Sequence, residues 1–79
     1  MPVKIYPNPF QSVLNIDFNA TNKMQKRISI YDVSGKLLIA KLSDGNTTLN
    51  VKQLITGTYL IKITDASGKL LYSGKVVKQ

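Results

Sequence analysis

The chain lacks several residue types on which enzymes and metal centres depend. Its 79 residues include no Cys, no His and no Glu. Without Cys there is no disulfide, no thiolate nucleophile and no Cys-ligated zinc site. Without His the commonest general base and the commonest metal ligand are missing. We therefore expect no catalytic residues, no bound metal and no cofactor.

The carboxylates are few and suggest turns rather than chemistry. Asp32, Asp44 and Asp65 lie in turn-forming segments, where Asp is a common residue, and Asp17 belongs to the polar face of an alternating segment. Glycoside hydrolysis needs two carboxylates facing each other across a substrate, and no such pair is indicated. Phosphate-binding glycine loops and calcium loops are also absent from the sequence. The sequence therefore predicts a protein that is not an enzyme.

Long apolar runs are missing as well. The longest run, Leu37 to Ala40, is far too short to span a membrane, and no stretch has the apolar core of a signal peptide. We therefore expect no membrane insertion. A chain of this length forms one domain, which buries only about 60% of its unfolded surface. Its start, Met1-Pro2-Val3-Lys4, is typical of an initiator methionine placed on an excised segment.

The charge is strongly positive, with ten Lys and Arg27 against four Asp and a net charge of +7. Such an excess favours an acidic partner, such as nucleic acid, lipid phosphate or an acidic glycan. Nucleic-acid readers depend on several Arg residues, however, and here the positive charges are scattered Lys. We therefore expect no nucleic-acid binding and interpret the Lys residues as lining solvent faces and strand edges. The scattered positions are Lys4, Lys23, Lys26, Lys41, Lys52, Lys62, Lys69 and Lys75.

Alternation of apolar and polar residues predicts short strands and little or no helix. In the segment Val13 to Asn19 the inward residues are Leu14, Ile16 and Phe18, a period of two that indicates a half-buried strand. Turn residues separate the segments, as in sandwich domains. The sequence therefore predicts an all-β, immunoglobulin-like β-sandwich of about seven antiparallel strands. The predicted strands are 3–6, 13–19, 27–33, 37–42, 47–51, 58–64 and 69–77, and the other inward residues are Ile28, Ile30, Leu49, Val51, Tyr59, Ile61 and Ile63.

An internal repeat supports this division of the chain. Residues 28–38 match residues 61–71 at an offset of 33, with eight of eleven positions identical. Two copies are too few for a solenoid, so we interpret them as two similar hairpins within one sandwich. In the first copy Gly35 can adopt a positive φ and Asp32 can accept hydrogen bonds from the turn, and Gly68 is the equivalent glycine in the second.

Aromatic residues and prolines mark two corners. Pro7 and Pro9 flank Asn8, and they stop the first strand and fix an extended corner. Tyr59 follows Gly57 at the start of the sixth strand, where its hydroxyl can bond to upstream backbone as in the tyrosine corner of sandwich domains. Two further rings, Tyr31 and Tyr72, either stack on a sugar or cover the edge of the sandwich, and the sequence leaves both possibilities open.

The chain ends in a strand pattern, Lys75-Val76-Val77-Lys78-Gln79. A basic, extended terminal strand can be recognised by strand addition or by capture of its carboxylate, and it can equally be a final edge strand. The segments 3–6 and 75–77 are the candidate edges for pairing with other chains.

Four segments in order give the sequence a family resemblance: residues 6–10, 30–36, 54–59 and 75–79. Together they resemble the type A C-terminal sorting domain of the type IX, or Por, secretion system of Bacteroidetes, over nearly the whole chain. By this resemblance Pro7, Asn8 and Pro9 match an opening motif. The recognised sorting motifs are then Gly57, Tyr59, Lys75, Val76, Val77, Lys78 and Gln79, while Pro7, Asn8, Pro9, Gly35 and Gly68 are structural.

The resemblance implies a secretion signal. Residues 1–79 are then a single domain excised from the end of a larger secreted protein, which passes through the periplasm on its way to the cell surface or the medium. Its partners are N-terminal cargo domains, translocon or shuttle proteins of the type IX machinery, and a surface sortase-like protease that removes it before the cargo is anchored or released. The cleavage site lies upstream. The alternative is an accessory adhesion or carbohydrate-binding sandwich in which Tyr31 or Tyr72 stacks on glycan.

Overall fold

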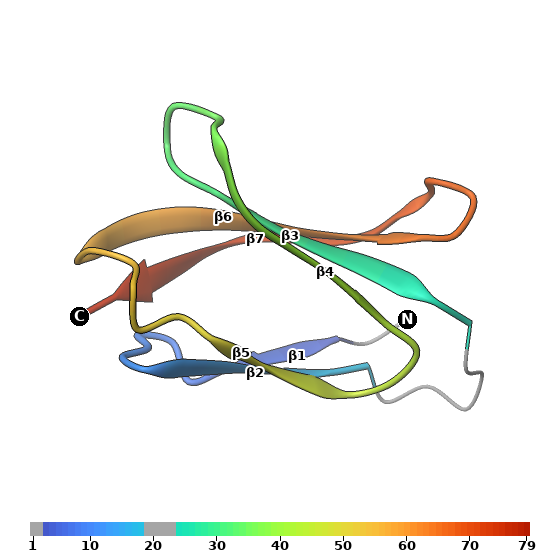
Figure 1. Cartoon of the computed structure of the whole chain (residues 1–79), viewed down its shortest axis with the longest axis horizontal. Coiled ribbons are helices and arrows are strands. Elements are labelled where there is room, and N and C mark those ends of the chain that lie inside the picture. The colour runs from blue at the N-terminus through green and yellow to red at the C-terminus, as the bar shows by residue number, and fades with distance from the viewer. Residues whose placement is uncertain (1–2, 19–23) are drawn as a thin grey trace.

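In the computed structural model, which describes residues 3–18 and 24–79, two antiparallel sheets pack face to face (Figure 1). The predicted all-β sandwich is confirmed, and each predicted strand is present with ends that shift by one or two residues. The predicted strand end at Asn19 lies outside the described residues, as do the polar residues 21–23, which the sequence predicts to form a turn. The strands are β1 (Lys4–Tyr6), β2 (Val13–Asp17), β3 (Lys26–Tyr31), β4 (Leu37–Ser43), β5 (Thr47–Asn50), β6 (Gly57–Asp65) and β7 (Leu70–Lys78).

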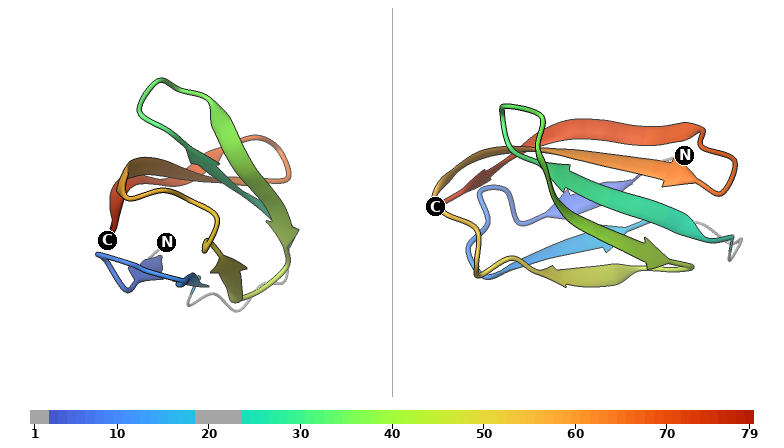
Figure 2. Two further views of the ribbon diagram at one scale, coloured as in Figure 1. Left: turned by 60° about the vertical axis from the view of Figure 1, so that its left-hand side comes forward. Right: turned by 45° about the horizontal axis from the view of Figure 1, so that its top comes forward.

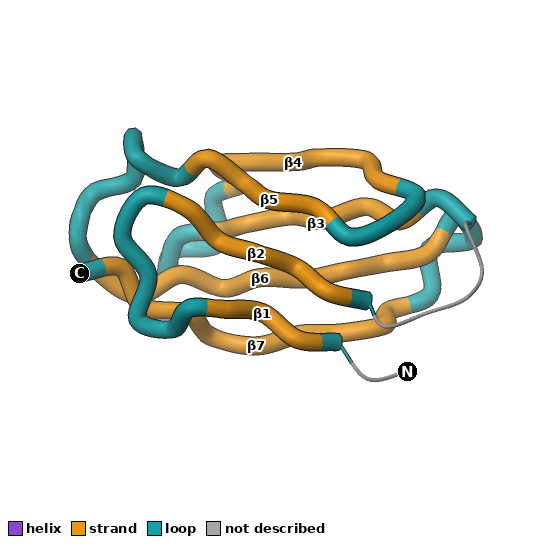
Figure 3. Tube along the Cα trace, turned by 90° about the horizontal axis from the view of Figure 1, so that it is seen from below, coloured by secondary structure: helices purple, strands orange, loops and turns teal. Residues whose placement is uncertain are grey.

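The strands divide into a three-stranded sheet, β1-β2-β5, and a four-stranded sheet, β4-β3-β6-β7. After β4 the chain crosses from one sheet to the other, as it does in immunoglobulin-like sandwiches (Figure 2). Seen from below, β1 lies over β7 and β5 lies over β4 (Figure 3). β1 and β7 are at the edges of their sheets, as predicted for the segments 3–6 and 75–77. None of the described residues forms a helix, so no helix long and apolar enough to cross a membrane occurs among them.

The apolar residues that alternate with polar ones along the strands form the core. All ten residues predicted to point inward are buried, and Phe10 and Val76 complete the cluster. Burying one such side chain contributes roughly 1.5–3 kcal/mol, so this cluster is the main source of stability in a chain without disulfides. The cluster is Phe10, Leu14, Ile16, Phe18, Ile28, Ile30, Leu49, Val51, Tyr59, Ile61, Ile63 and Val76.

The internal repeat forms two hairpins of the same construction, β3–β4 and β6–β7. In the first, the Asp32 carboxylate accepts hydrogen bonds from the Ser34 hydroxyl at 2.6 Å, the Ser34 N–H at 2.9 Å and the Lys36 N–H at 3.0 Å. Asp65 accepts the equivalent three bonds in the second. The glycines of the two turns have φ of 92° and 90°. The predicted pair of similar hairpins is confirmed.

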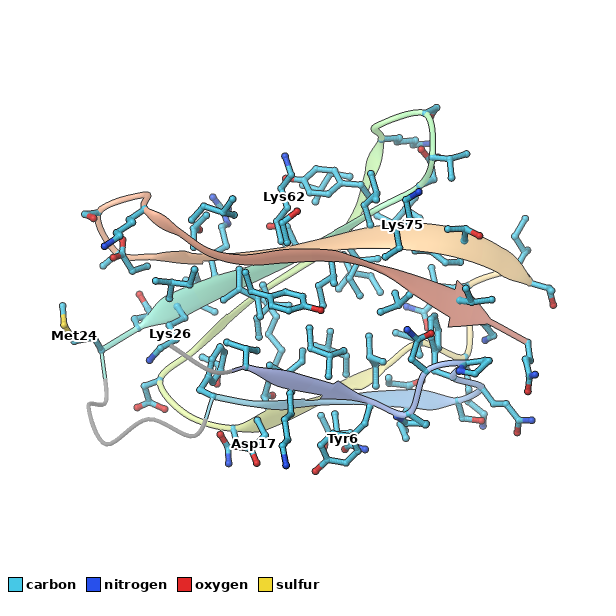
Figure 4. The ribbon with its side chains drawn as sticks, turned by 180° about the vertical axis from the view of Figure 1, so that it is seen from behind. Tyr6, Asp17, Met24, Lys26, Lys62 and Lys75 are labelled. Atoms are coloured by element: carbon cyan, nitrogen blue, oxygen red, sulfur yellow. The ribbon has the colours of Figure 1, made fainter. Side chains whose placement is uncertain are left out.

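The expectation that the lysines line solvent faces is wrong at two strand ends, those of Lys26 and Lys78. Lys26 is only 2% exposed, and its ammonium donates to the Met24 carbonyl at 2.9 Å and lies 5.0 Å from the ring centroid of Phe18. Figure 4 shows it directed toward the three-stranded sheet. The reason is register, because Lys26 has the same parity in β3 as the buried Ile28 and Ile30. Its aliphatic stem therefore packs inside while its charge finds a carbonyl and a ring face.

Candidate functional site

The opening, central and terminal motifs meet at one end of the sandwich. Gly57 pairs with Lys78 and Tyr59 with Val76 in the β6–β7 ladder, and Phe10 forms a parallel bridge with Lys78. The ring centroids of Phe10 and Tyr59 are 6.3 Å apart. In Figure 1 the loop after β1, the loop before β6 and the end of β7 lie on the same side. We call this group the C-terminal site, formed by Asn8, Phe10, Gly57, Tyr59 and residues 75–79.

Residues 8–10 hold the outer edge of β7. The side-chain oxygen of Asn8 accepts the Val77 N–H at 3.0 Å, and its side-chain nitrogen donates to the Lys75 carbonyl at 3.4 Å. Phe10 continues the pairing, because its N–H donates to the Val77 carbonyl at 2.8 Å and its carbonyl accepts the Gln79 N–H at 2.9 Å. A side-chain amide carries the same donor and acceptor as a peptide group. Asn8 thus continues a ladder that its flanking prolines, both preceded by cis peptide bonds, cannot.

The last residues of β7 alternate between two settings. Val76 and Lys78 point inward and are 1% and 9% exposed, whereas Lys75, Val77 and Gln79 are exposed. The Lys78 ammonium donates to the Val51 carbonyl at 2.8 Å and to the Lys52 carbonyl at 3.1 Å. Lys78 therefore ties the end of β7 to the corner between β5 and β6. The recognition role predicted for residues 75–79 stays a prediction, with only three of the five side chains turned to solvent.

The central motif is a structural corner. Tyr59 is buried, and its hydroxyl donates a hydrogen bond to the Ile55 carbonyl, so the predicted tyrosine corner is confirmed. Gly57 has φ of 154°, a conformation that residues with a side chain rarely adopt. Together the two residues set the direction in which β6 leaves the corner and hence the position of β7.

Neither tyrosine suggested for sugar stacking presents an open ring. Tyr72 packs against the core and covers Gly74, where an added Cβ would lie 2.7 Å from the Tyr72 hydroxyl oxygen. Tyr31 is half-buried, and the ammonium of Lys62 lies 5.5 Å from its ring centroid. Tyr72 thus packs against the core as a partly buried residue, and Tyr31 has a lysine over its ring.

Sequence reasoning missed the positive surface beside β7. The outer face of the four-stranded sheet, the side turned away from the three-stranded sheet, carries a cross-strand row of Tyr31, Leu60 and Lys75. Lys62 stands in the next row, and Figure 4 shows Lys62 and Lys75 projecting from this face. Only strand register brings these residues together, because they come from three strands.

The acidic side chains lie apart from one another, and two of them accept hydrogen bonds within their own turns. Within residues 3–18 and 24–79, no three acidic side chains lie close enough together to hold a metal ion. Hydrogen bonds, foremost from the hydroxyls of Ser34 and Ser67, hold the pKa of Asp32 and of Asp65 below the usual value. Both carboxylates thus serve their own turns. What the site offers chemically is a shaped, positively charged surface.

Fold and site together define a small immunoglobulin-like module whose distinctive residues gather around its last strand. Residues 4–79 match the family described as secretion system C-terminal sorting domain, and the chain belongs to this family. No curated protein matches the chain. Domains of this family are the C-terminal sorting signal for type IX secretion and are secretion tags rather than catalysts. The domain therefore interacts with the type IX machinery and directs an N-terminally attached cargo to the cell surface or the extracellular space.

Proposed function

We propose that this domain ends a larger secreted protein and takes its cargo from the periplasm through the outer membrane. Translocon or shuttle proteins read the folded domain, and a surface sortase-like protease then removes it so that the cargo is anchored or released. The observation that carries the proposal is the family match, which spans residues 4–79 and so includes all seven strands and the C-terminal site.

The C-terminal site is the part of the domain that we expect the machinery to read. Cargoes differ, so the signal must keep its shape whatever precedes it. Asn8 and Phe10 fix the outer edge of β7, and Lys78 fixes its inner side. A rigid positive surface of this kind favours fast and selective encounter with an acidic partner.

An export assay tests the proposal. The chain is fused to the C-terminus of a periplasmically targeted fluorescent protein in a type IX-competent host, with a translocon-null strain as control. We expect fluorescence at the surface or in the medium only when the translocon is intact. Retention of a folded fusion in the periplasm of the competent host would contradict the proposal.

To test which side chains of β7 the machinery reads, we choose substitutions that leave the fold intact. Lys75→Ser with Val77→Ser changes only outward side chains, and we expect it to lower export several-fold because contacts to a partner are lost. Lys4→Ser with Val33→Ser is the matched control, because it removes one exposed Lys and one exposed Val outside the C-terminal site. Equal export by both variants would show that the outward side chains of β7 are not read.

A further inference from the structure

The end of β7 presents side chains to a partner rather than a free backbone edge. Val77 already uses its N–H on Asn8 and its carbonyl on Phe10, and the Gln79 N–H is also bonded to Phe10. A partner adding a strand along residues 75–79 would have to displace all of these bonds. The outward side chains of Lys75, Val77 and Gln79 remain available, and those of Lys75 and Val77 lie within β7.

Those side chains belong to the outer face of the four-stranded sheet. Lys75 lies opposite Leu60, and Leu60 lies opposite Tyr31 on the next strand. Val77 is 40% exposed, and Leu42 at the far edge of the sheet is 56% exposed. The face therefore combines cations with apolar and aromatic side chains. An apolar part inside a polar rim is the common arrangement of a protein-binding surface, and here Tyr31 and Leu60 lie on the inner strands β3 and β6.

The positive charges on this face have no carboxylates between them. Lys62 pairs with Ser73, so it is the diagonal neighbour of Lys75, a relation that places side chains roughly 7–8 Å apart. Arg27 is exposed on the same face, opposite Thr64. Asp17 lies in β2, Asp44 lies between β4 and β5, and Asp32 is bonded within its turn; Asp65 lines a hollow together with Arg27, but its carboxylate is bonded within its own turn. Positive charges this close together create a local positive potential, to which opposite charge on a partner is attracted.

We propose that the outer face of the four-stranded sheet is the docking surface of the domain, and that its occupant is an acidic protein surface of the secretion machinery with an apolar centre. The proposal rests on the proposed sorting function and specifies how the partner is bound. Carboxylates of the partner face Lys62 and Lys75, and its apolar centre covers Leu60, Tyr31 and Val77. The partner binds flat against the sheet and adds no strand at residues 75–79.

The composition of the face favours a protein over a phosphate-bearing lipid surface. Scattered lysines such as Lys4 and Lys52 would serve a diffuse anionic surface equally well, because such binding follows net charge. On the outer face the cations instead lie beside Leu60 and beside Tyr31, whose ring already lies under the Lys62 ammonium, so a partner surface with apolar groups can cover Leu60 while its carboxylates face the lysines.

Charge reversal in the export assay tests the proposal. Each Lys→Glu substitution changes the charge by −2, so Lys62→Glu with Lys75→Glu lowers the net charge from +7 to +3. Lys4→Glu with Lys52→Glu makes the same change in net charge away from the outer face. We expect the first pair to lower the exported fraction at least about tenfold, because carboxylates would then oppose carboxylates, and the control pair to export like the unchanged domain. Lys62→Arg with Lys75→Arg keeps both charges and should retain export.

The outcomes separate the two proposals. If the unchanged domain is not exported, the sorting function itself fails. If it is exported and the outer-face pair is exported equally well, or both reversed pairs lose export equally, the docking surface is wrong. Thermal unfolding of each purified variant establishes whether it is folded. If Lys62→Glu with Lys75→Glu is not folded, the test rests on Lys62→Arg with Lys75→Arg.

Sedimentation with vesicles that contain anionic phosphatidylglycerol tests the other occupant. We expect the two charge-reversed pairs to bind these vesicles equally. Vesicle binding that is lost only in Lys62→Glu with Lys75→Glu would show that the outer face binds an anionic lipid surface instead, and it would overturn the assignment to a protein partner.

Discussion

At the scale of single residues, a few side chains bonded to backbone groups determine the shape of the C-terminal site. Tyr59 has a ring in the core and a hydroxyl bonded to the Ile55 carbonyl, so it joins the corner to the sandwich. Lys78 does the same from the other side, with its stem buried and its ammonium on two carbonyls. Such bonds add little energy singly, but each fixes the direction of a strand.

The Tyr59 hydroxyl can be removed without removing the ring. We expect Tyr59→Phe to lower the free energy of unfolding by about 1 kcal/mol, because the corner loses one hydrogen bond while the core keeps its volume. Tyr6→Phe is the control, since Tyr6 is 49% exposed and its change should stay within about 0.5 kcal/mol. Urea unfolding of the two variants measures both values, and equal effects would rule out a role for the corner bond.

The two aspartate turns predict an acid dependence of stability. Hydrogen bonds lower the folded-state pKa of Asp32 and of Asp65, so both groups release protons more readily when folded. Their contribution is therefore complete above the unfolded pKa, about 3.9, and is lost as the pH falls through the lower folded pKa. Melting temperatures between about pH 5 and pH 2 should fall less in Asp32→Asn with Asp65→Asn than in the unchanged domain. Each single variant, with the same turn geometry, should show about half of that change.

At the scale of elements, the short segment after β1 acts as a partner strand for β7. Asn8→Ala removes the side chain that pairs with Val77 and Lys75. We expect the amide hydrogen exchange of Val77 to become about tenfold faster, while the amides of central β6 residues such as Ile61 keep their rates.

A conservative exchange separates the two halves of the Asn8 contact. In Asn8→Asp the carboxylate still accepts from the Val77 N–H but has no donor for the Lys75 carbonyl. The Val77 amide should therefore remain protected. Exchange of the Val77 amide that is as fast in Asn8→Asp as in Asn8→Ala would contradict this description of the contact.

Contacts between near neighbours in the chain could be predicted, and those between distant segments could not. Tyr59 and Ile55 are four residues apart, and the bonds of Asp32 lie within its own turn, so turn chemistry in the sequence indicated both. Asn8 and Val77 are 69 residues apart. Which edge of β7 the opening motif would cover depends on how the two sheets stack, and no local pattern encodes that.

The inward rows of the strands were predictable because alternation reports burial directly, but the same rule misled for lysine. Lys26 and Lys78 occupy inward positions at strand ends, where a long stem can be buried while the ammonium reaches a carbonyl. Sequence reasoning assigned them to solvent or to a partner by residue type. The outer face was missed for a related reason, because its members come from separate strands and meet only through register.

At the scale of the whole molecule, the last strand belongs to the core and is no appendage. We expect deletion of residues 75–79 to abolish cooperative unfolding, because it removes the buried Val76, the Lys78 bonds and the pairing of Gly57 and Tyr59. Calorimetry of the shortened chain measures this, with Lys75→Ser and Val77→Ser as a control that should melt cooperatively. A sharp transition in the shortened chain would show that β7 is dispensable to the fold.

The parallel pairing of Phe10 with Lys78 also has a mechanical meaning. Cargo joined before β1 and a grip on the end of β7 would pull these two segments in opposite directions along their common axis. Parallel segments loaded in this way slide in shear, so the bonds of Asn8 and Phe10 to residues 75–79 share the force instead of unzipping in turn. Tension between the cargo and the end of β7 would therefore load these bonds together.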